Sequence, residues 1–170
     1  MIPFQKNLPN PHQFSILGIA CYILKPKTTV MNTSKFVLAG IAGGVVIFLL
    51  GYLTYGMLLM DFFTTHAGPA KGVGRESSHM LFGYLIFGNI LFGFLLAYVI
   101  RKAGISTLSK GLVAGAIVGF LTSASTDCVS YATTWVQSRT SAAADVVTFT
   151  VLSAVAGAVV AWIAGTGKKA

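Results

Sequence analysis

The sequence predicts an all-α integral membrane protein whose four transmembrane helices pack as a bundle. Of its residues, 55% are hydrophobic and only 9% are charged, whereas about a quarter of the residues in a soluble domain are charged. Four apolar runs are each long enough to cross the roughly 30 Å hydrocarbon core of a bilayer, which takes about 20 helical residues. Helices also satisfy their own backbone hydrogen bonds in lipid. The short connections between runs favour antiparallel neighbours.

The first 31 residues differ from the rest of the chain. A Pro- and Asn-rich start, "MIPFQKNLPNPHQF", precedes only eleven apolar residues, "FSILGIACYIL". A signal peptide is the alternative, but a single Lys precedes the apolar run and no small-x-small cleavage site is clear. We therefore expect a poorly ordered N-terminal extension over residues 1–31, with Met31 as a natural start, and a transmembrane domain over residues 32–170.

Four spans follow in order along the chain. The first ends in "GYLTYGMLLM", the second runs from "MLFGY" to "AYVI", and the third opens with "GLVAGAIVGF". Asp145 directly precedes the fourth, where we expect its carboxylate to cap the helix and to favour the positive end of the helix dipole. The predicted spans are about residues 36–60, 80–100, 111–135 and 146–165.

The distribution of Lys and Arg predicts the orientation of the spans. Apart from Lys6 near the start of the chain, eight of these residues lie before span 1, between spans 2 and 3, or after span 4, and only Lys71, Arg75 and Arg139 lie in the other two connections. Because cytoplasmic loops carry an excess of Lys and Arg, both termini should be cytoplasmic. The net charge of +8 then indicates contact with anionic lipid headgroups. No nucleic-acid motif appears, so we expect no nucleic-acid partner.

Small residues recur every four positions in spans 3 and 4, a spacing that lets helix backbones approach closely. Span 2 spaces its glycines by five and gives a less regular stripe. These residues serve either helix packing alone or the binding of lipid or a partner. The similar openings "KFVLAGIAGG" and "KGLVAGAIVG" also suggest two tandem helical hairpins. The predicted packing residues are Gly111, Gly115, Gly119 and Gly157.

The segments "GYLTYGMLLMDFF", "GNILFGFLLAYVI" and "AVAGAVVAWIAG", with the glycine-rich start of span 3, resemble a group of small four-span bacterial membrane proteins known only as a domain of unknown function. The resemblance covers roughly residues 32–167. It implies a bacterial inner-membrane location. It brings no activity, ligand or site residue.

The segment "FLTSASTDCVSYATTW", residues 120–135, holds a carboxylate inside an apolar span. Asp127 lies about 24 Å along span 3 from the cytoplasmic side, so it is in the outer half of the bilayer. An ionised Asp is unfavourable on a lipid face, and its side chain should therefore face the bundle interior. It is either a proton- or cation-responsive group or a structural carboxyl that ties helices together. The predicted polar site comprises Asp127, Tyr52, Tyr55, Asn89, Ser123 and Ser153.

A second polar cluster is predicted in the first extracytoplasmic loop. Its two histidines and two acids suggest a metal site, but their spacing matches no ligand motif, and a solvated loop with an ionic link between Arg75, Glu76 and Asp61 is the preferred interpretation. We expect neither a metal nor another cofactor. The cluster comprises Asp61, His66, Arg75, Glu76 and His79.

No catalytic motif is visible, so the sequence does not predict an enzyme. Two functions remain. The first is a structural or accessory membrane protein that binds lipid or a partner through glycine-lined helix faces. The second is a small transporter or channel, oligomeric because four short helices enclose little space, with Asp127 as its proton- or ion-coupled group. Membrane lipids and either a second copy or a partner membrane protein are the expected partners.

Overall fold

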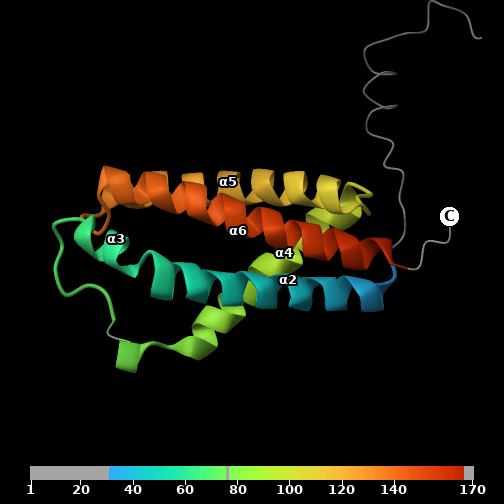
Figure 1. Cartoon of the computed structure of the whole chain (residues 1–170), viewed down its shortest axis with the longest axis horizontal. Helices are drawn as coiled ribbons and strands as arrows, with labels where there is room; N and C mark the ends of the chain where they lie inside the picture. Colours follow the sequence, from blue (N-terminus) through green and yellow to red (C-terminus); the bar gives the residue numbers. More distant parts are fainter. Residues whose placement is uncertain (1–30, 76, 167–170) are drawn as a thin grey trace, which may run out of the picture.

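A computed structural model describes residues 31–75 and 77–166, so the predicted N-terminal extension, apart from Met31, lies outside the described residues. The all-α four-helix fold is confirmed, and the described residues form no strand beyond one isolated bridge between Ala67 and Gln137. Figure 1 shows four long helices lying along one axis. The helices are α2 (Thr33–Leu53), a π-helical turn η2 (Thr54–Leu58), α3 (Met60–Thr65), a 3-10 turn η3 (Ser77–His79), α4 (Phe82–Lys102), α5 (Leu108–Thr133) and α6 (Arg139–Gly165).

Four of these segments are long and apolar enough to cross a membrane: residues 33–58, 82–102, 108–133 and 139–165. The first three agree with the predicted spans to within three residues at each end. The fourth begins at Arg139 instead of residue 146, because Ser138 caps the helix there. Its hydroxyl accepts a hydrogen bond from the Ser141 amide at 3.1 Å, and the alanine-rich residues that follow favour helix.

The expected role of Asp145 as a helix cap is therefore wrong. Asp145 is the seventh residue of α6, in the second turn, and its side chain is half-buried among the helices. The early cap at Ser138 moves this carboxyl from the membrane surface into the bundle.

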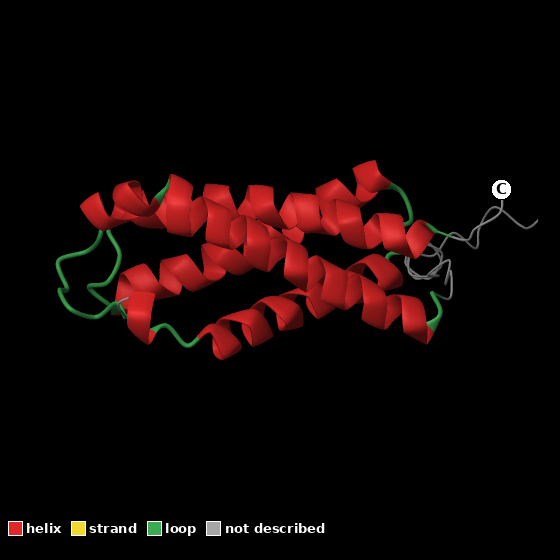
Figure 2. Cartoon of the chain, turned by 60° about the horizontal axis from the view of Figure 1, so that its bottom comes forward, coloured by secondary structure: helices red, strands yellow, loops and turns green. Residues whose placement is uncertain are grey.

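The four helices are arranged as two antiparallel hairpins. α2 packs chiefly on α4, α5 packs chiefly on α6, and contacts of α2 with α6 join the two pairs. Figure 2 shows all four helices lengthwise, with their connections at the two ends of the bundle. α4 makes few contacts with α5, so α6 occupies the centre of the arrangement.

Glycines set the closest contacts inside both hairpins. A Cβ atom at Gly115 would overlap the backbone of Ser153 and Gly157, and one at Gly111 would overlap the backbone of Gly157. The first hairpin uses the same device where Gly93 meets α2. Gly111, Gly115, Gly119 and Gly157 therefore lie at the contact between α5 and α6, inside the chain's own fold.

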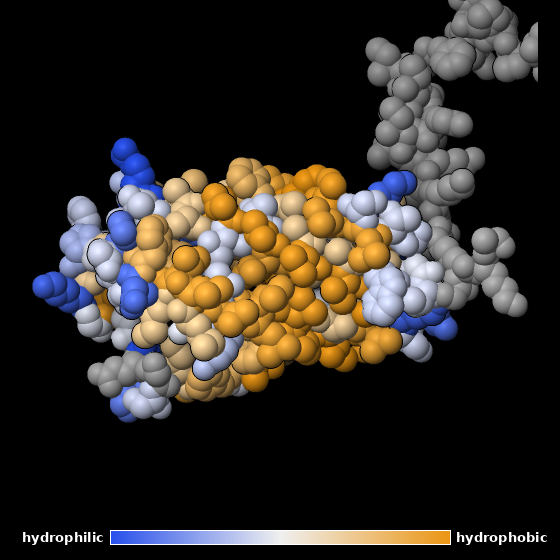
Figure 3. All heavy atoms as spheres, viewed as in Figure 1, coloured by the Kyte–Doolittle hydropathy of each residue, from blue (hydrophilic) through white to orange (hydrophobic). Residues whose placement is uncertain are grey.

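The surface of the bundle is divided into an apolar middle and two hydrophilic ends. Figure 3 shows this band of hydrophobic residues between the hydrophilic ends. Large apolar side chains such as Leu121 (62% exposed) and Val147 (65%) point outward, whereas the fully buried core is small and includes Leu96, Ile100 and Val160. Outward-facing apolar side chains on membrane-length helices are the arrangement of a multi-pass membrane protein.

The first half of α4 diverges from α2. Figure 1 shows this part of α4 leaving the bundle at an angle. Tyr84 is 78% exposed and Phe87 is 60% exposed, and a Cβ atom at Gly83 or Gly88 would meet nothing within 4 Å. The divergence leaves space beside α2 and α6.

The tight contact between α5 and α6 can be tested with a matched pair of substitutions. Gly115→Ala adds a methyl group that overlaps the Ser153 backbone, so we expect the free energy of unfolding to fall by about 1–3 kcal/mol, the usual effect of overpacking. Gly88→Ala, at an open helix position, should leave the free energy of unfolding unchanged or raise it slightly. Thermal unfolding in detergent measures both, and equal stability of the two variants would contradict the packing role of Gly115.

Candidate functional site

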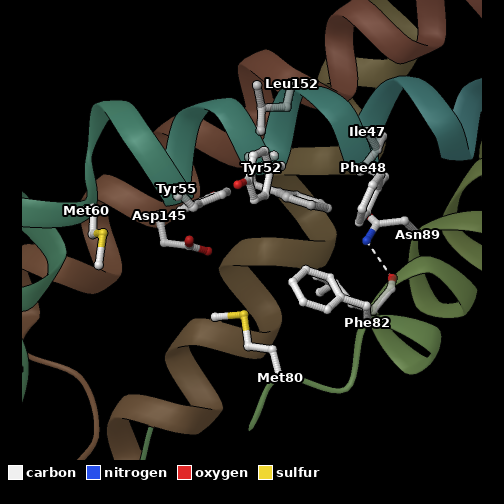
Figure 4. A pocket seen from close by; sticks show the side chains of 14 residues that line it. Ile47, Phe48, Tyr52, Tyr55, Met60, Met80, Phe82, Asn89, Asp145 and Leu152 are labelled. Carbon is white, nitrogen blue, oxygen red and sulfur yellow. Dashed lines mark hydrogen bonds between the residues drawn. The ribbon is translucent and has the colours of Figure 1, made fainter. Parts of the chain in front are cut away.

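A pocket of about 600 Å³ lies between α2, η2, α4 and α6, where α4 diverges. Figure 4 shows side chains from these helices pointing into it from several directions. Its lining is mostly apolar and aromatic, with few polar groups. The lining residues are Ile47, Phe48, Gly51, Tyr52, Tyr55, Gly56, Met60, Met80, Phe82, Leu85, Asn89, Asp145, Phe149 and Leu152.

The π-helical turn η2 brings Tyr55 into this pocket. The Leu59 amide donates to the Thr54 carbonyl at 2.7 Å, a bond spanning five residues instead of four. The extra residue bends the end of the first span, and Tyr55 packs on Phe63 of α3 with ring centroids 5.4 Å apart. Single π turns within α-helices are frequent at functional sites.

Asp145 is the charged residue of the pocket lining, and no Lys, Arg or His joins it among the described residues that line the pocket. Its polar companions there are Tyr52, Tyr55 and Asn89. The Asn89 amide nitrogen donates to the Leu85 carbonyl of its own helix at 2.7 Å. In Figure 4, Tyr55 and Asp145 lie side by side and extend in the same direction into the pocket.

Asp127 lies on α5, outside the pocket lining, near Asp145 of α6. Gly115 meets Ser153 and Gly119 meets Phe149, so four residues along α5 correspond to four residues backward along α6. The same register places Asp127 between the heights of Ser141 and Asp145, within about one helical turn of each. The Asp145 carboxyl accordingly lies near both Asp127 and Tyr55.

The Asp127 carboxyl is buried, with only 6% of the residue exposed. One of its oxygens, Oδ1, accepts a hydrogen bond from the Gln137 side-chain amide at 3.0 Å. Within residues 31–75 and 77–166, the other oxygen, Oδ2, is buried without a hydrogen-bond partner, as are Tyr55 Oη and Gln137 Oε1. Buried polar atoms without a partner are rare in folded proteins, so each of them needs an explanation. These three atoms belong to Asp127 and to two side chains close to the carboxyl pair.

Gln137 links Asp127 to a cap over this end of the bundle. The cap consists of residues 66–70 and residues 134–138, which pair through the bridge between Ala67 and Gln137. The Gly68 amide donates to the Val136 carbonyl at 2.9 Å, and a Cβ atom at Gly68 would overlap the backbone there. The Ser138 hydroxyl also donates to the His66 carbonyl. The buried carboxyl is therefore held by the connection that closes its own hairpin.

The predicted polar site is only partly assembled. Tyr52, Tyr55 and Asn89 line the pocket, but Tyr52 is 57% exposed. The Ser123 hydroxyl donates to the Gly119 carbonyl of its own helix at 2.9 Å. Ser153 is fully buried against Gly119, about 12–18 Å of helix rise from the level of Asp127. The inclusion of Ser153 in one site with Asp127 is therefore wrong, because α6 begins earlier than predicted.

The outer-loop cluster does not form a metal site among the described residues, where no group of three His, Cys, Asp or Glu side chains could hold an ion. His66 stacks on Phe62 with ring centroids 4.4 Å apart. The Asp61 carbonyl accepts hydrogen bonds from Thr64 and Thr65. Glu76 lies outside the described residues, and so does the predicted ionic link through it. Arg75 and His79 are exposed.

No family model, curated protein or solved structure matches the chain. The resemblance to small four-span bacterial membrane proteins therefore stays a prediction, and the geometry of the site carries the functional argument.

Sequence reasoning missed Gln137 and the inward position of Asp145, although one signal for the latter was present. Asp127 and Asp145 each lie nine residues from Val136, at the middle of the connection between the last two helices. In an antiparallel hairpin, residues equally far from the turn lie at the same height. Gln137 carried no such signal, because its contact depends on the path of the loop.

The role of Gln137 can be tested through the cap. Gln137→Ala removes the partner of a buried carboxyl, a hydrogen bond whose loss we expect to weaken the cap by about 1.5–3 kcal/mol. Hydrogen exchange at the Gly68 and Ala70 amides, which bond to Val136 and Trp135, should accelerate accordingly. Thr133→Ala removes a hydroxyl that bonds to its own helix and serves as the control. Unchanged exchange in Gln137→Ala would show that the side chain does not hold the cap.

Proposed function

We propose that this multi-pass membrane protein binds a small amphipathic molecule in the pocket between α2, α4 and α6. This proposal rests on the pocket itself. It has a volume of about 600 Å³ and a mostly apolar and aromatic lining that includes Tyr55, Asn89 and Asp145. Small-molecule sites in proteins have this size and this composition, a hydrophobic wall with a few placed polar groups.

The pocket is a better candidate for lipid or ligand binding than the glycine-lined faces. Gly115 and Gly157 are buried against the opposite helix of their own hairpin, so these faces are occupied within the chain. The pocket, in contrast, has several lining residues whose side chains are exposed, including Tyr52, Met60 and Phe82. These residues lie on the outside of the bundle, which supports entry of a ligand from the surrounding membrane.

A small oligomeric transporter or channel is the second candidate. It is favoured by the unpartnered Oδ2 of Asp127 beside the Asp145 carboxyl, because intramembrane acids commonly mark proton or ion pathways. Transport requires that the carboxyl pair be reached from both sides in turn. Proton uptake into liposomes that is lost in Asp127→Asn would favour this candidate over binding alone.

We also propose that the protein lies in the bacterial inner membrane with both termini in the cytoplasm. Lys35, Arg101, Lys102 and Lys110 lie at or near one end of the described helices. The excess of Lys and Arg at this end supports its cytoplasmic location. The cap and the pocket then lie in the outer half of the membrane.

The orientation can be tested by labelling single cysteines in a variant without Cys21 and Cys128. A membrane-impermeant maleimide added outside spheroplasts should label Val73→Cys, in the first loop, and should not label Ala103→Cys, after α4, until the membrane is opened. Both positions are exposed. Labelling of Ala103→Cys alone would reverse the orientation, and labelling of both from one side would break the four-span topology.

The pocket can be tested by filling it. Gly51 lines the pocket, and a Cβ atom there would meet nothing within 4 Å, so Gly51→Phe should occupy the space without disturbing the helix contacts. We expect it to weaken saturable binding of tetraphenylphosphonium or triphenylphosphine oxide by about tenfold or more, since the ring displaces the ligand from its apolar wall. Equilibrium dialysis with protein in lipid nanodiscs, corrected by empty nanodiscs, measures the binding.

Gly88→Phe is the matched control, because Gly88 is equally open but is not part of the pocket lining. Binding should be retained in this variant. Equal binding by both variants, or no saturable binding by the unsubstituted protein, would contradict a ligand site in this pocket.

A further inference from the structure

We infer that the ligand of this pocket is a lipophilic cation, whose charge is balanced by the neighbouring carboxyls of Asp145 and Asp127. This inference rests on the proposed function and specifies its substrate class. It follows from three features of the pocket: the sign of its charge, the nature of its walls and the position of its polar groups.

The charge of the pocket has one sign. Asp145 is the charged lining residue, and no Lys, Arg or His lines the pocket in the described part of the chain. An anionic ligand, or a phospholipid whose phosphate entered the pocket, would meet a carboxylate with no counter-charge. Burying a charge without a partner is strongly unfavourable, so the pocket excludes anions.

The carboxyl of Asp127, outside the pocket lining, strengthens the preference of the pocket for cations. It lies near Asp145 but is 6% exposed and does not line the pocket. Among the described residues its second oxygen has no hydrogen-bond partner, so one acceptor atom of this carboxyl is left unused by the fold. Two carboxyls in a low-dielectric site attract a cation more strongly than one exposed carboxylate does, because charge interactions are less screened there.

The walls suit an organic cation better than a hydrated metal ion. Phe48, Tyr52, Tyr55, Phe82 and Phe149 line the pocket, and the faces of aromatic rings attract cations within about 6 Å. The lining offers few oxygen atoms, whereas hard metal ions need six or more oxygen ligands. The two methionines of the lining, Met60 and Met80, are flexible and adapt to ligands of irregular shape.

The position of the carboxyl orients such a ligand. Asp145 lies about 9 Å of helix rise from the start of α6 at the cap end, whereas Ile47 and Leu152 lie deeper in the span. The charged group of the ligand therefore lies near the cap, and its apolar body extends toward the middle of the membrane. A molecule in the outer leaflet with its charge at the headgroups already has this orientation.

The experiment compares three aryl probes of similar size and different charge: tetraphenylphosphonium, triphenylphosphine oxide and tetraphenylborate. Binding to the full-length protein in nanodiscs made of neutral lipid is measured by equilibrium dialysis. We expect the cation to bind about tenfold or more tightly than the neutral probe, from the carboxylate and the aromatic rings together, and the anion to bind least. Asp145→Asn should remove this preference and leave the affinity for the neutral probe unchanged.

Asp61→Asn is the control, because Asp61 carries a carboxyl at the same end of the bundle but is exposed and does not line the pocket. It should keep the preference for the cation. Pocket-dependent binding of the neutral probe equal to that of the cation would overturn the inference and leave the proposed function standing. Absence of pocket-dependent binding by all three probes would overturn both.

Discussion

The close backbone contact between α5 and α6 is the constraint on which the rest of the structure depends. Gly111, Gly115 and Gly119 on one helix and Gly157 on the other bring the two backbones together. Such contacts stabilise helix pairs in lipid, where the hydrophobic effect does not drive helices together. They also admit only one register, since a Cβ atom in place of these hydrogens would overlap the facing backbone.

This register determines the chemistry at the outer end of the hairpin. With the glycines in contact, Asp127 and Asp145 come within about one helical turn of each other in height, and the connection between the helices places Gln137 on Asp127. Removing the Gln137 hydrogen bond at this point would affect both the carboxyls and the cap. Helix packing, loop closure and site electrostatics are thus one coupled arrangement.

The fold was predictable from the sequence because it depends on hydropathy and length, which are local properties of the chain. The closeness of Asp127 and Asp145 was also predictable, because the two residues are equally far from the turn between the last two helices. It was not predicted, because the last span was expected to start at residue 146. The π turn at Tyr55 and the bridge between Ala67 and Gln137 were not predictable, because each depends on backbone contacts between separate segments. The same holds for the divergence of α4, although the irregular glycine spacing of that span is consistent with an incomplete contact.

The two carboxyls of Asp127 and Asp145 lower the stability of the fold at the place where we propose that the ligand binds. A buried acid without a cation stabilises a helix pair less than an apolar residue of similar volume would, and packing at the glycine contact does not require one. The chain has four acidic residues in all, and two of them lie together within the membrane-spanning part. Tight packing therefore supports a local arrangement that is unfavourable for folding alone. A cation that enters beside Asp145 would reduce the repulsion between the two neighbouring carboxyls. The ligand that the pocket favours is therefore also the one that would stabilise the fold.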